Sequence, residues 1–185
     1  MTFDMDTSYN IYTNKKLAEM IYQKLIRFMD GSFKKPVIMT AESFTGGAIS
    51  AALVSVAGIS EFFKGSVVAY DNSIKVSLAG VNVETLNRHG AVSAETVAEM
   101  ASCLKKRYGA DIAIATSGVA GPGGGSIEKP IGTAWFGFDF FGDAYNVKKK
   151  FNGSRSDITR KGVEFVLRET LRALRRFEEK SKSVF

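Results

Sequence analysis

The chain has 185 residues, 45% of them hydrophobic and 24% charged, which is ordinary for one globular domain and leaves little room for a second. It contains no apolar run of membrane-spanning length and no signal-peptide pattern, so we expect a cytoplasmic protein without membrane contact. The chain has a single cysteine, which excludes an internal disulfide. Because it also has only one histidine, a structural zinc site is not expected.

The net charge of +6 is distributed unevenly along the chain. Residues 147–185 carry twelve Lys and Arg against five Asp and Glu, whereas the rest of the chain is close to neutral. Such a basic segment can attract nucleic acid or a phosphorylated small molecule, and a solvated helix face explains it equally well. Few aromatic side chains are interleaved with these arginines, so a nucleic-acid partner is disfavoured.

Apolar periodicity and turn residues predict the secondary structure. In chain order we expect a helix over 14–28, a strand over 36–40, a helix over 48–58, a strand over 65–70, helices over 73–78, 83–88 and 94–108, a strand over 111–116, a hairpin of strands 131–138 and 144–151, and a helix from about 156. Early alternation followed by a hairpin predicts an α/β fold, a three-layer α/β/α sandwich with a mixed, mostly parallel sheet of about five strands. We expect residues 1–12 to form a flexible arm, 13–178 a single domain and 179–185 a flexible tail.

The first candidate site loop follows the strand over 36–40 and leads into a helix through Ser43, Thr45, Gly46 and Gly47. Open α/β sheets bind ligands at the carboxyl ends of their strands. Free N–H groups at a helix start suit a phosphate or a developing oxyanion, and Ser43 is a candidate nucleophile. The alternative is that Ser43 or Thr45 only caps the helix.

The second loop contains Tyr70, Asn72 and Lys75. A serine nucleophile needs a base, and because His89 is the only histidine, a Ser–Lys pair is the economical substitute. Lys75 then has to lose its proton near neutrality, so its pKa must fall far below about 10.4, which burial or a nearby cation can achieve. Otherwise Lys75 stays charged and binds a phosphate, or it is an ordinary surface lysine.

The third loop is rich in glycine and follows the apolar strand over 111–116. It begins at Ser117 and contains Gly118, Gly121, Gly123, Gly124 and Gly125. Glycine permits positive φ and close backbone approach, so the loop can form an anion-binding nest, although it is neither a P-loop nor a Rossmann fingerprint. A purely structural loop is the alternative. Arg155, near the start of the last helix, can grip a phosphate bidentately or be a plain surface residue.

Five separated motifs together resemble the CinA C-terminal domain, the nicotinamide-nucleotide amidase of the competence/damage-inducible protein family. They are Ala41-Glu-Ser-x-Thr-Gly-Gly47, Tyr70-x-Asn72 with Lys75, His89-Gly-Ala-Val-Ser93, Ser117-Gly-x-Ala-Gly-Pro-x-Gly-Gly125 with Glu128-Lys-Pro-x-Gly-Thr133, and Phe151-x-Gly-x-Arg155. Their order and their span, from about Leu17 to Leu174, make the resemblance specific.

The resemblance implies the same α/β/α fold and hydrolysis of nicotinamide mononucleotide to nicotinate mononucleotide and ammonia, without metal or cofactor. It implies that Ser43 is the nucleophile, that Lys75 assists it, and that Tyr70 lines the catalytic centre. The residues expected to contact the phosphorylated substrate are Thr45, Gly46, Gly47, Asn72, Ser117, Gly118, Gly121, Gly123, Gly124, Gly125 and Arg155. Relatives often form dimers, so a homodimer or a higher homo-oligomer is a further expectation.

The chain departs from the family in two respects. Members commonly carry Cys where this chain has Phe44, whose bulk beside the nucleophile is expected to narrow the pocket or to alter the substrate. Many relatives also carry a large N-terminal domain that acts on pyrophosphate-linked nucleotides, and we expect that activity to be absent. If Phe44 blocks chemistry, the alternative function is a module that binds a pyridine nucleotide without turnover.

Overall fold

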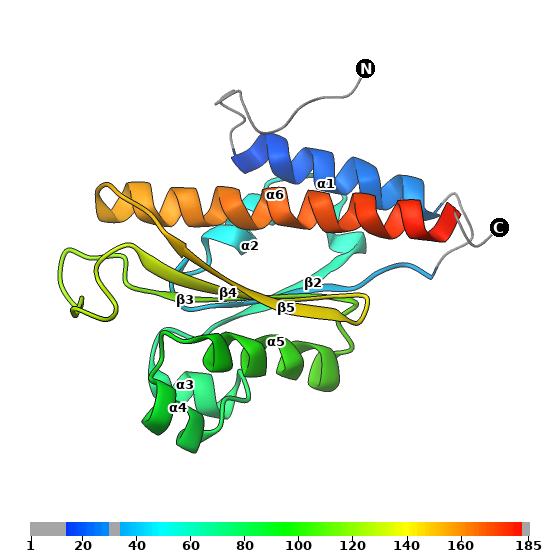
Figure 1. Ribbon diagram of the computed structural model, residues 1–185. Helices are drawn as coiled ribbons and strands as arrows, with labels where there is room; N and C mark the ends of the chain where they lie inside the picture. The colour runs from blue at the N-terminus through cyan, green and yellow to red at the C-terminus, as the bar shows by residue number, and fades with distance from the viewer. Residues whose placement is uncertain (1–13, 30–33, 183–185) are drawn as a thin grey trace.

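The structure, a computed structural model, describes residues 14–29 and 34–182 (Figure 1). In chain order the elements are α1 (Asn14–Met29), β1 (Ile38–Glu42), α2 (Ala48–Val54), a 3-10 turn (Ile59–Glu61), β2 (Phe63–Val68), α3 (Asn72–Ser77), α4 (Val83–His89), α5 (Ala94–Tyr108), β3 (Ile112–Gly118), β4 (Thr133–Phe140), β5 (Asp143–Lys150) and α6 (Arg155–Lys182). The order and type of the helices and strands agree with the prediction.

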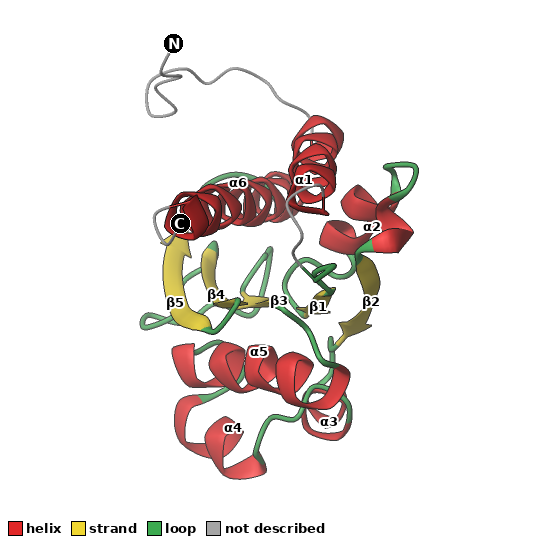
Figure 2. Ribbon diagram, turned by 90° about the vertical axis from the view of Figure 1, so that its right-hand side faces the viewer, coloured by secondary structure: helices red, strands yellow, loops and turns green. Residues whose placement is uncertain are grey.

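The strands form one mixed sheet in the order β2-β1-β3-β4-β5. Strand β1 pairs in parallel with β2 and with β3, whereas β4 runs antiparallel to both β3 and β5. Helices α1, α2 and α6 cover one face of the sheet and α3, α4 and α5 lie on the other (Figure 2). The predicted three-layer sandwich is therefore confirmed.

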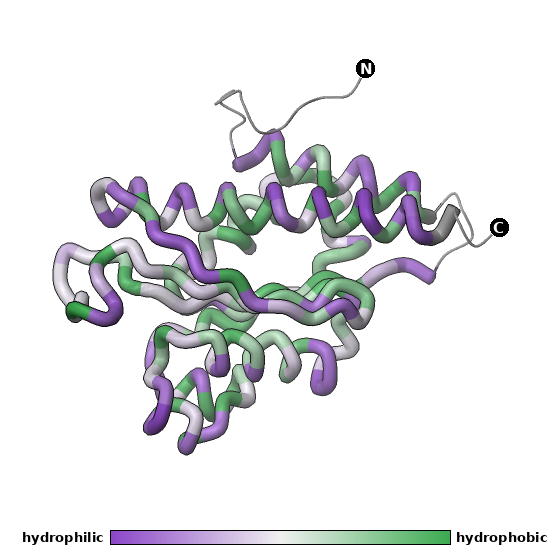
Figure 3. Tube along the Cα trace, viewed as in Figure 1, coloured by the Kyte–Doolittle hydropathy of each residue, from purple (hydrophilic) through white to green (hydrophobic). Residues whose placement is uncertain are grey.

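Each face of the sheet has its own apolar core. In β1, Ile38 packs into the cluster beneath α1 and α6, whereas Met39 and Ala41 pack into the cluster beneath α5. In β3, Ile112 joins the first cluster and Ala113 the second. The hydropathy trace in Figure 3 shows hydrophobic residues along the inner strands and alternating character along α6. Strands covered on both faces explain why the sequence gives short continuous apolar runs instead of alternation.

Some boundaries differ from the predicted ones. The turn between β4 and β5 is Phe141-Gly142, with φ angles of 55° and 97°, because a two-residue hairpin turn of this hand needs positive φ at both positions. Helix α6 continues to Lys182, beyond residue 178 where we placed the end of the domain. The predicted arm over residues 1–12 lies outside the described residues. Within the described ranges, no helix combines the length and apolar character needed to cross a membrane.

Candidate active site

The three candidate loops meet at one edge of the sheet, as the topology predicted. Because β1, β2 and β3 are mutually parallel, their carboxyl ends point the same way. Backbone bonds continue the pairing beyond the strands: Ser43 N donates to Thr116 O at 3.0 Å, and Ala69 N donates to Glu42 O at 2.9 Å. Ser43 thus lies beside the carboxyl end of β3, and Glu42, the residue before it, lies beside the segment that follows β2.

Ser43 begins a tight turn in which the Ser43 hydroxyl and several backbone N–H groups have no hydrogen-bond partner among the described residues. The residue is 9% exposed, and its hydroxyl takes part in no hydrogen bond among the described residues. In that same part of the chain every fully buried side-chain N or O atom has a partner, so the Ser43 hydroxyl must be reachable by solvent. The N–H groups of Phe44, Thr45 and Gly46 likewise donate to no described residue. A hydroxyl followed by free N–H donors is an arrangement that suits acyl transfer.

Two groups that we expected to contact the substrate, the Gly47 N–H and the Thr45 hydroxyl, are hydrogen-bonded to the carboxylate of Glu42. Gly47 N donates to the Glu42 carboxylate at 3.0 Å, and Thr45 Oγ1 donates to it at 2.7 Å. Thr45 Oγ1 also lies 2.9 Å from Thr116 Oγ1. The capping alternative is wrong, because the N-cap of α2 is Gly47, without a side-chain cap bond. A charged residue at the end of an apolar strand indicates that Glu42 needs hydrogen-bond partners, but it does not indicate which groups they are.

Lys75 is buried, so the surface-lysine alternative is wrong. It lies in α3, whose N-cap Asp71 accepts a hydrogen bond from Ser73 N at 2.8 Å. Lys75 is only 2% exposed. Its Nζ donates a hydrogen bond to Tyr70 O at 2.9 Å. Desolvation lowers the pKa of Lys75, while the charge of Asp71 partly opposes that shift. The direction is the one that a general base requires.

Arg155, the first residue of α6, joins two of the loops. Its Nη1 donates to Gly121 O at 2.6 Å and its Nη2 donates to Tyr70 Oη at 2.9 Å. Both Arg155 and Tyr70 are exposed, Tyr70 by 63%. Strand β5 is parallel to β3 through β4, so its carboxyl end delivers Arg155 to the same edge as Ser43.

Three of the loop glycines are needed for packing. A Cβ at Gly118 would lie 2.8 Å from Thr133 O, and one at Gly125 would lie 3.0 Å from Ile131 N. Gly121 has a φ of 81° and a Cβ there would come within 2.8 Å of the Ile131 side chain. The structural alternative therefore accounts for these three positions.

Gly123 and Gly124 differ, because a Cβ at either would meet nothing within 4 Å. Gly124 also has a φ of 81°, a conformation that favours glycine. The backbone of these two residues is exposed and can approach a ligand. Asn72, at the start of α3, is exposed as well and makes no side-chain hydrogen bond among the described residues.

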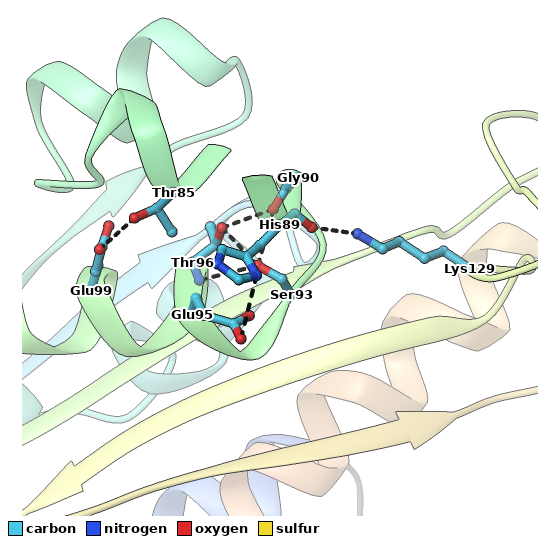
Figure 4. A network of polar contacts seen from close by, with 8 residues as sticks. All are labelled: Thr85, His89, Gly90, Ser93, Glu95, Thr96, Glu99 and Lys129. Atoms are coloured by element: carbon cyan, nitrogen blue, oxygen red, sulfur yellow. Dashed lines mark hydrogen bonds and ion pairs between the residues drawn. The ribbon is translucent and has the colours of Figure 1, made fainter. Parts of the chain in front are cut away.

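The His89–Ser93 motif holds the glycine-rich loop against the α4–α5 turn (Figure 4). Lys129 Nζ donates to His89 O at 2.6 Å, and Ser93 caps α5 by accepting from Thr96 N at 3.2 Å. The Ser117 hydroxyl donates a hydrogen bond to Ala91 O at 2.6 Å. The role of this motif is therefore structural: it holds the glycine-rich loop and the start of α5 in place.

Phe44 does not narrow the site, contrary to our expectation. Its side chain is 5% exposed and packs edge-on against Phe136 in the core beneath α6, with ring centroids 6.2 Å apart. Gly162 provides the room, because a Cβ there would overlap the Phe44 ring. The large residue is therefore accommodated inside the core.

Two hollows in the described surface lie away from Ser43 and Lys75. One, of about 610 Å³, lies between α1 and α6 and is lined by residues such as Met20, Arg27 and Leu171. The other, of about 450 Å³, lies between the glycine-rich loop and the end of β5, near Ile127 and Lys150. The convergent polar groups, rather than the size of a hollow, identify the candidate site.

Comparison with known proteins decides the family. The CinA C-terminal domain profile matches residues 15–174. The chain belongs to the CinA C-terminal domain family. The nicotinamide-nucleotide amidohydrolase PncC of Enterobacter agglomerans is 43% identical over 136 residues, which cover 73% of this chain and 83% of that protein.

Other relatives are longer proteins. A CinA-like protein of Petrotoga mobilis is 46% identical over 136 residues, which are 74% of this chain and 34% of that protein. The match to the CinA-like protein of Kosmotoga olearia covers 40% of its length. The chain thus spans between a third and two fifths of these two relatives.

Solved structures share the fold. A competence or damage-inducible protein from Enterobacter asburiae superposes with a TM-score of 0.81 at 36% identity, covering 89% of this chain and 99% of that one. A CinA superfamily protein from Klebsiella pneumoniae 700603 gives a TM-score of 0.82 at 33% identity, with the same coverage.

Proposed function

We propose that the chain is a nicotinamide-nucleotide amidase that hydrolyses nicotinamide mononucleotide to nicotinate mononucleotide and ammonia. The observation that carries the proposal is the burial of Lys75, with a lowered pKa, at the sheet edge where Ser43 presents a free hydroxyl. The relative named as a nicotinamide-nucleotide amidohydrolase supports the choice of substrate.

The first half of the reaction acylates the serine. Neutral Lys75 accepts the proton of the Ser43 hydroxyl as its oxygen attacks the carboxamide carbon. The free N–H groups of Phe44, Thr45 and Gly46 hold the oxyanion that forms. The tetrahedral intermediate then collapses, the C–N bond breaks, and Lys75 returns the proton to the departing ammonia. The hydrogen bond that Lys75 Nζ donates to Tyr70 O keeps the amine in place throughout.

The second half releases the acid. Lys75 takes a proton from water while the water oxygen attacks the acyl carbon, and the ester bond to Ser43 breaks with return of that proton to the serine oxygen. The product is nicotinate mononucleotide. The 5′-phosphate is held by Arg155, which is exposed and has guanidinium N–H groups beyond those bound to Tyr70 and Gly121. The open backbone of Gly123 and Gly124 completes this phosphate contact.

Ammonia release from nicotinamide mononucleotide tests the proposal. The unaltered chain should release ammonia and Ser43→Ala should lose that activity, because the variant has no nucleophile. Ser60→Ala, an exposed serine in the turn Ile59–Glu61, is the matched control and should keep full activity. Full activity in Ser43→Ala would show that another group attacks the amide.

A further inference from the structure

Glu42 is the most heavily hydrogen-bonded buried charge in the described chain, and the proposed chemistry does not use it. Its side chain is fully buried. One carboxylate oxygen accepts from Thr45 Oγ1 at 2.7 Å, from Gly47 N at 3.0 Å and from Ile49 N at 3.0 Å. The other accepts from Ser50 N at 2.9 Å and from the Ser50 hydroxyl.

These contacts close a loop around the nucleophile. The Glu42 backbone ends β1, where its carbonyl accepts from Ala69 N at 2.9 Å. The Glu42 carboxylate binds the N–H of Gly47, the residue that follows the turn of residues 43–46. One residue therefore fixes both ends of the turn that carries Ser43 and the three free N–H groups.

We propose that Glu42 is the positioning residue of the amidase: its carboxylate holds the Ser43 hydroxyl and the N–H groups of Phe44, Thr45 and Gly46 in register for attack and for oxyanion binding. The inference rests on the proposed function for its catalytic consequence. It also assigns two roles to Thr45. The Thr45 hydroxyl helps to hold the Glu42 carboxylate in place, and the Thr45 N–H is one of the donors to the oxyanion.

Both carboxylate oxygens of Glu42 are needed as acceptors, so its shape alone is not sufficient. A glutamine is nearly isosteric, but its amide NH2 is a donor and not an acceptor. In one orientation the NH2 faces the N–H groups of Gly47 and Ile49, and in the other it faces the N–H of Ser50. Either way a backbone donor loses its acceptor, so Glu42→Gln releases one anchor of the turn.

Kinetics of Glu42→Gln test the proposal. A displacement of about 1 Å in the reacting groups costs roughly 100-fold in rate, so kcat should fall by about that factor. KM should change little, because the phosphate contacts of Arg155 and the glycine-rich loop lie elsewhere. Thr45→Val, which removes one donor to the carboxylate and keeps the shape, should lower kcat less, by about tenfold, and serves if Glu42→Gln does not fold.

Ser66→Ala is the matched control. Ser66 Oγ lies in the same network, 3.5 Å from the Glu42 carboxylate and 2.7 Å from Thr40 Oγ1, yet it belongs to β2 and anchors no part of the turn. It should lower Tm while leaving kcat near that of the unaltered chain. If Ser66→Ala loses as much kcat as Glu42→Gln for the same fall in Tm, or if Glu42→Gln and Thr45→Val both keep kcat, the role is merely structural and the proposal is overturned.

Backbone amide NMR separates this inference from the proposed function. In Glu42→Gln the signals of residues 43–46 should shift and the N–H of Gly47 should exchange with solvent faster, whereas Ser66→Ala should leave both unchanged. If the unaltered chain releases no ammonia, the proposed function fails and these signals alone decide the positioning claim. Unmoved signals for residues 43–46 in Glu42→Gln would overturn it.

Discussion

Replacing Lys75 with Met tests whether the buried amine is poised to act as a base. Lys75 is 2% exposed and makes no ion pair with a carboxylate in the described part of the chain. Methionine keeps much of the length and the apolar stem but removes the charge. The lost bond to Tyr70 O adds a destabilising offset that does not depend on pH.

The size of the expected effect follows from how the free energy of unfolding depends on pH. Desolvation lowers the pKa of folded Lys75 below the ordinary value of 10.5, so between the two values the unfolded chain binds more protons than the folded one. The free energy of unfolding therefore rises with pH in that window, by at most about 1.4 kcal/mol per pH unit, and levels off above 10.5. Lys75→Met lacks this contribution.

Urea unfolding of both proteins, measured from pH 7 to pH 11, provides the test. The difference in free energy of unfolding between the unaltered chain and Lys75→Met should grow with pH in favour of the unaltered chain. In parallel, kcat/KM of the unaltered chain should rise with pH and reach a plateau once Lys75 is neutral, and Lys75→Met should be inactive. Parallel stability curves would refute the lowered pKa.

Two other variants test the rest of the site. Arg155→Lys replaces a fork that binds Tyr70 Oη and Gly121 O with a single ammonium, so KM for nicotinamide mononucleotide should rise by about tenfold with a smaller change in kcat; an unchanged KM in steady-state kinetics would contradict the phosphate assignment. Gly162→Ala drives a Cβ into the Phe44 ring and should lower the free energy of unfolding by about 1–3 kcal/mol. Adding Phe44→Cys should relieve that clash, and strictly additive losses in urea unfolding would contradict the paired packing.

The fold was largely predictable because its signals are local. Strand β3 reads as a buried strand from its continuous small apolar residues, and Ser93 caps α5 as predicted. The parallel order of β1, β2 and β3 then brings Ser43, Tyr70 and Ser117 to one edge. Alternating strands and helices dictate this arrangement without any side-chain detail.

The roles of individual polar groups were less predictable, because they depend on contacts between distant segments. Nothing local indicates that the Glu42 carboxylate accepts a hydrogen bond from Gly47 N, or that the Ser117 hydroxyl donates one to Ala91 O. The fate of Phe44 depends on Gly162, more than a hundred residues away in sequence. Contacts of this kind are determined by the tertiary structure and have no signal in the local sequence.

Mass spectrometry of the chain quenched during turnover of nicotinamide mononucleotide tests the Ser43 mechanism most directly. The mechanism requires a transient ester, so the peptide that contains Ser43 should carry the added mass of the nicotinate mononucleotide acyl group, and the same peptide from Ser43→Ala should not. An acyl group found on another residue, or turnover that persists in Ser43→Ala, would contradict the assignment of Ser43 as the nucleophile.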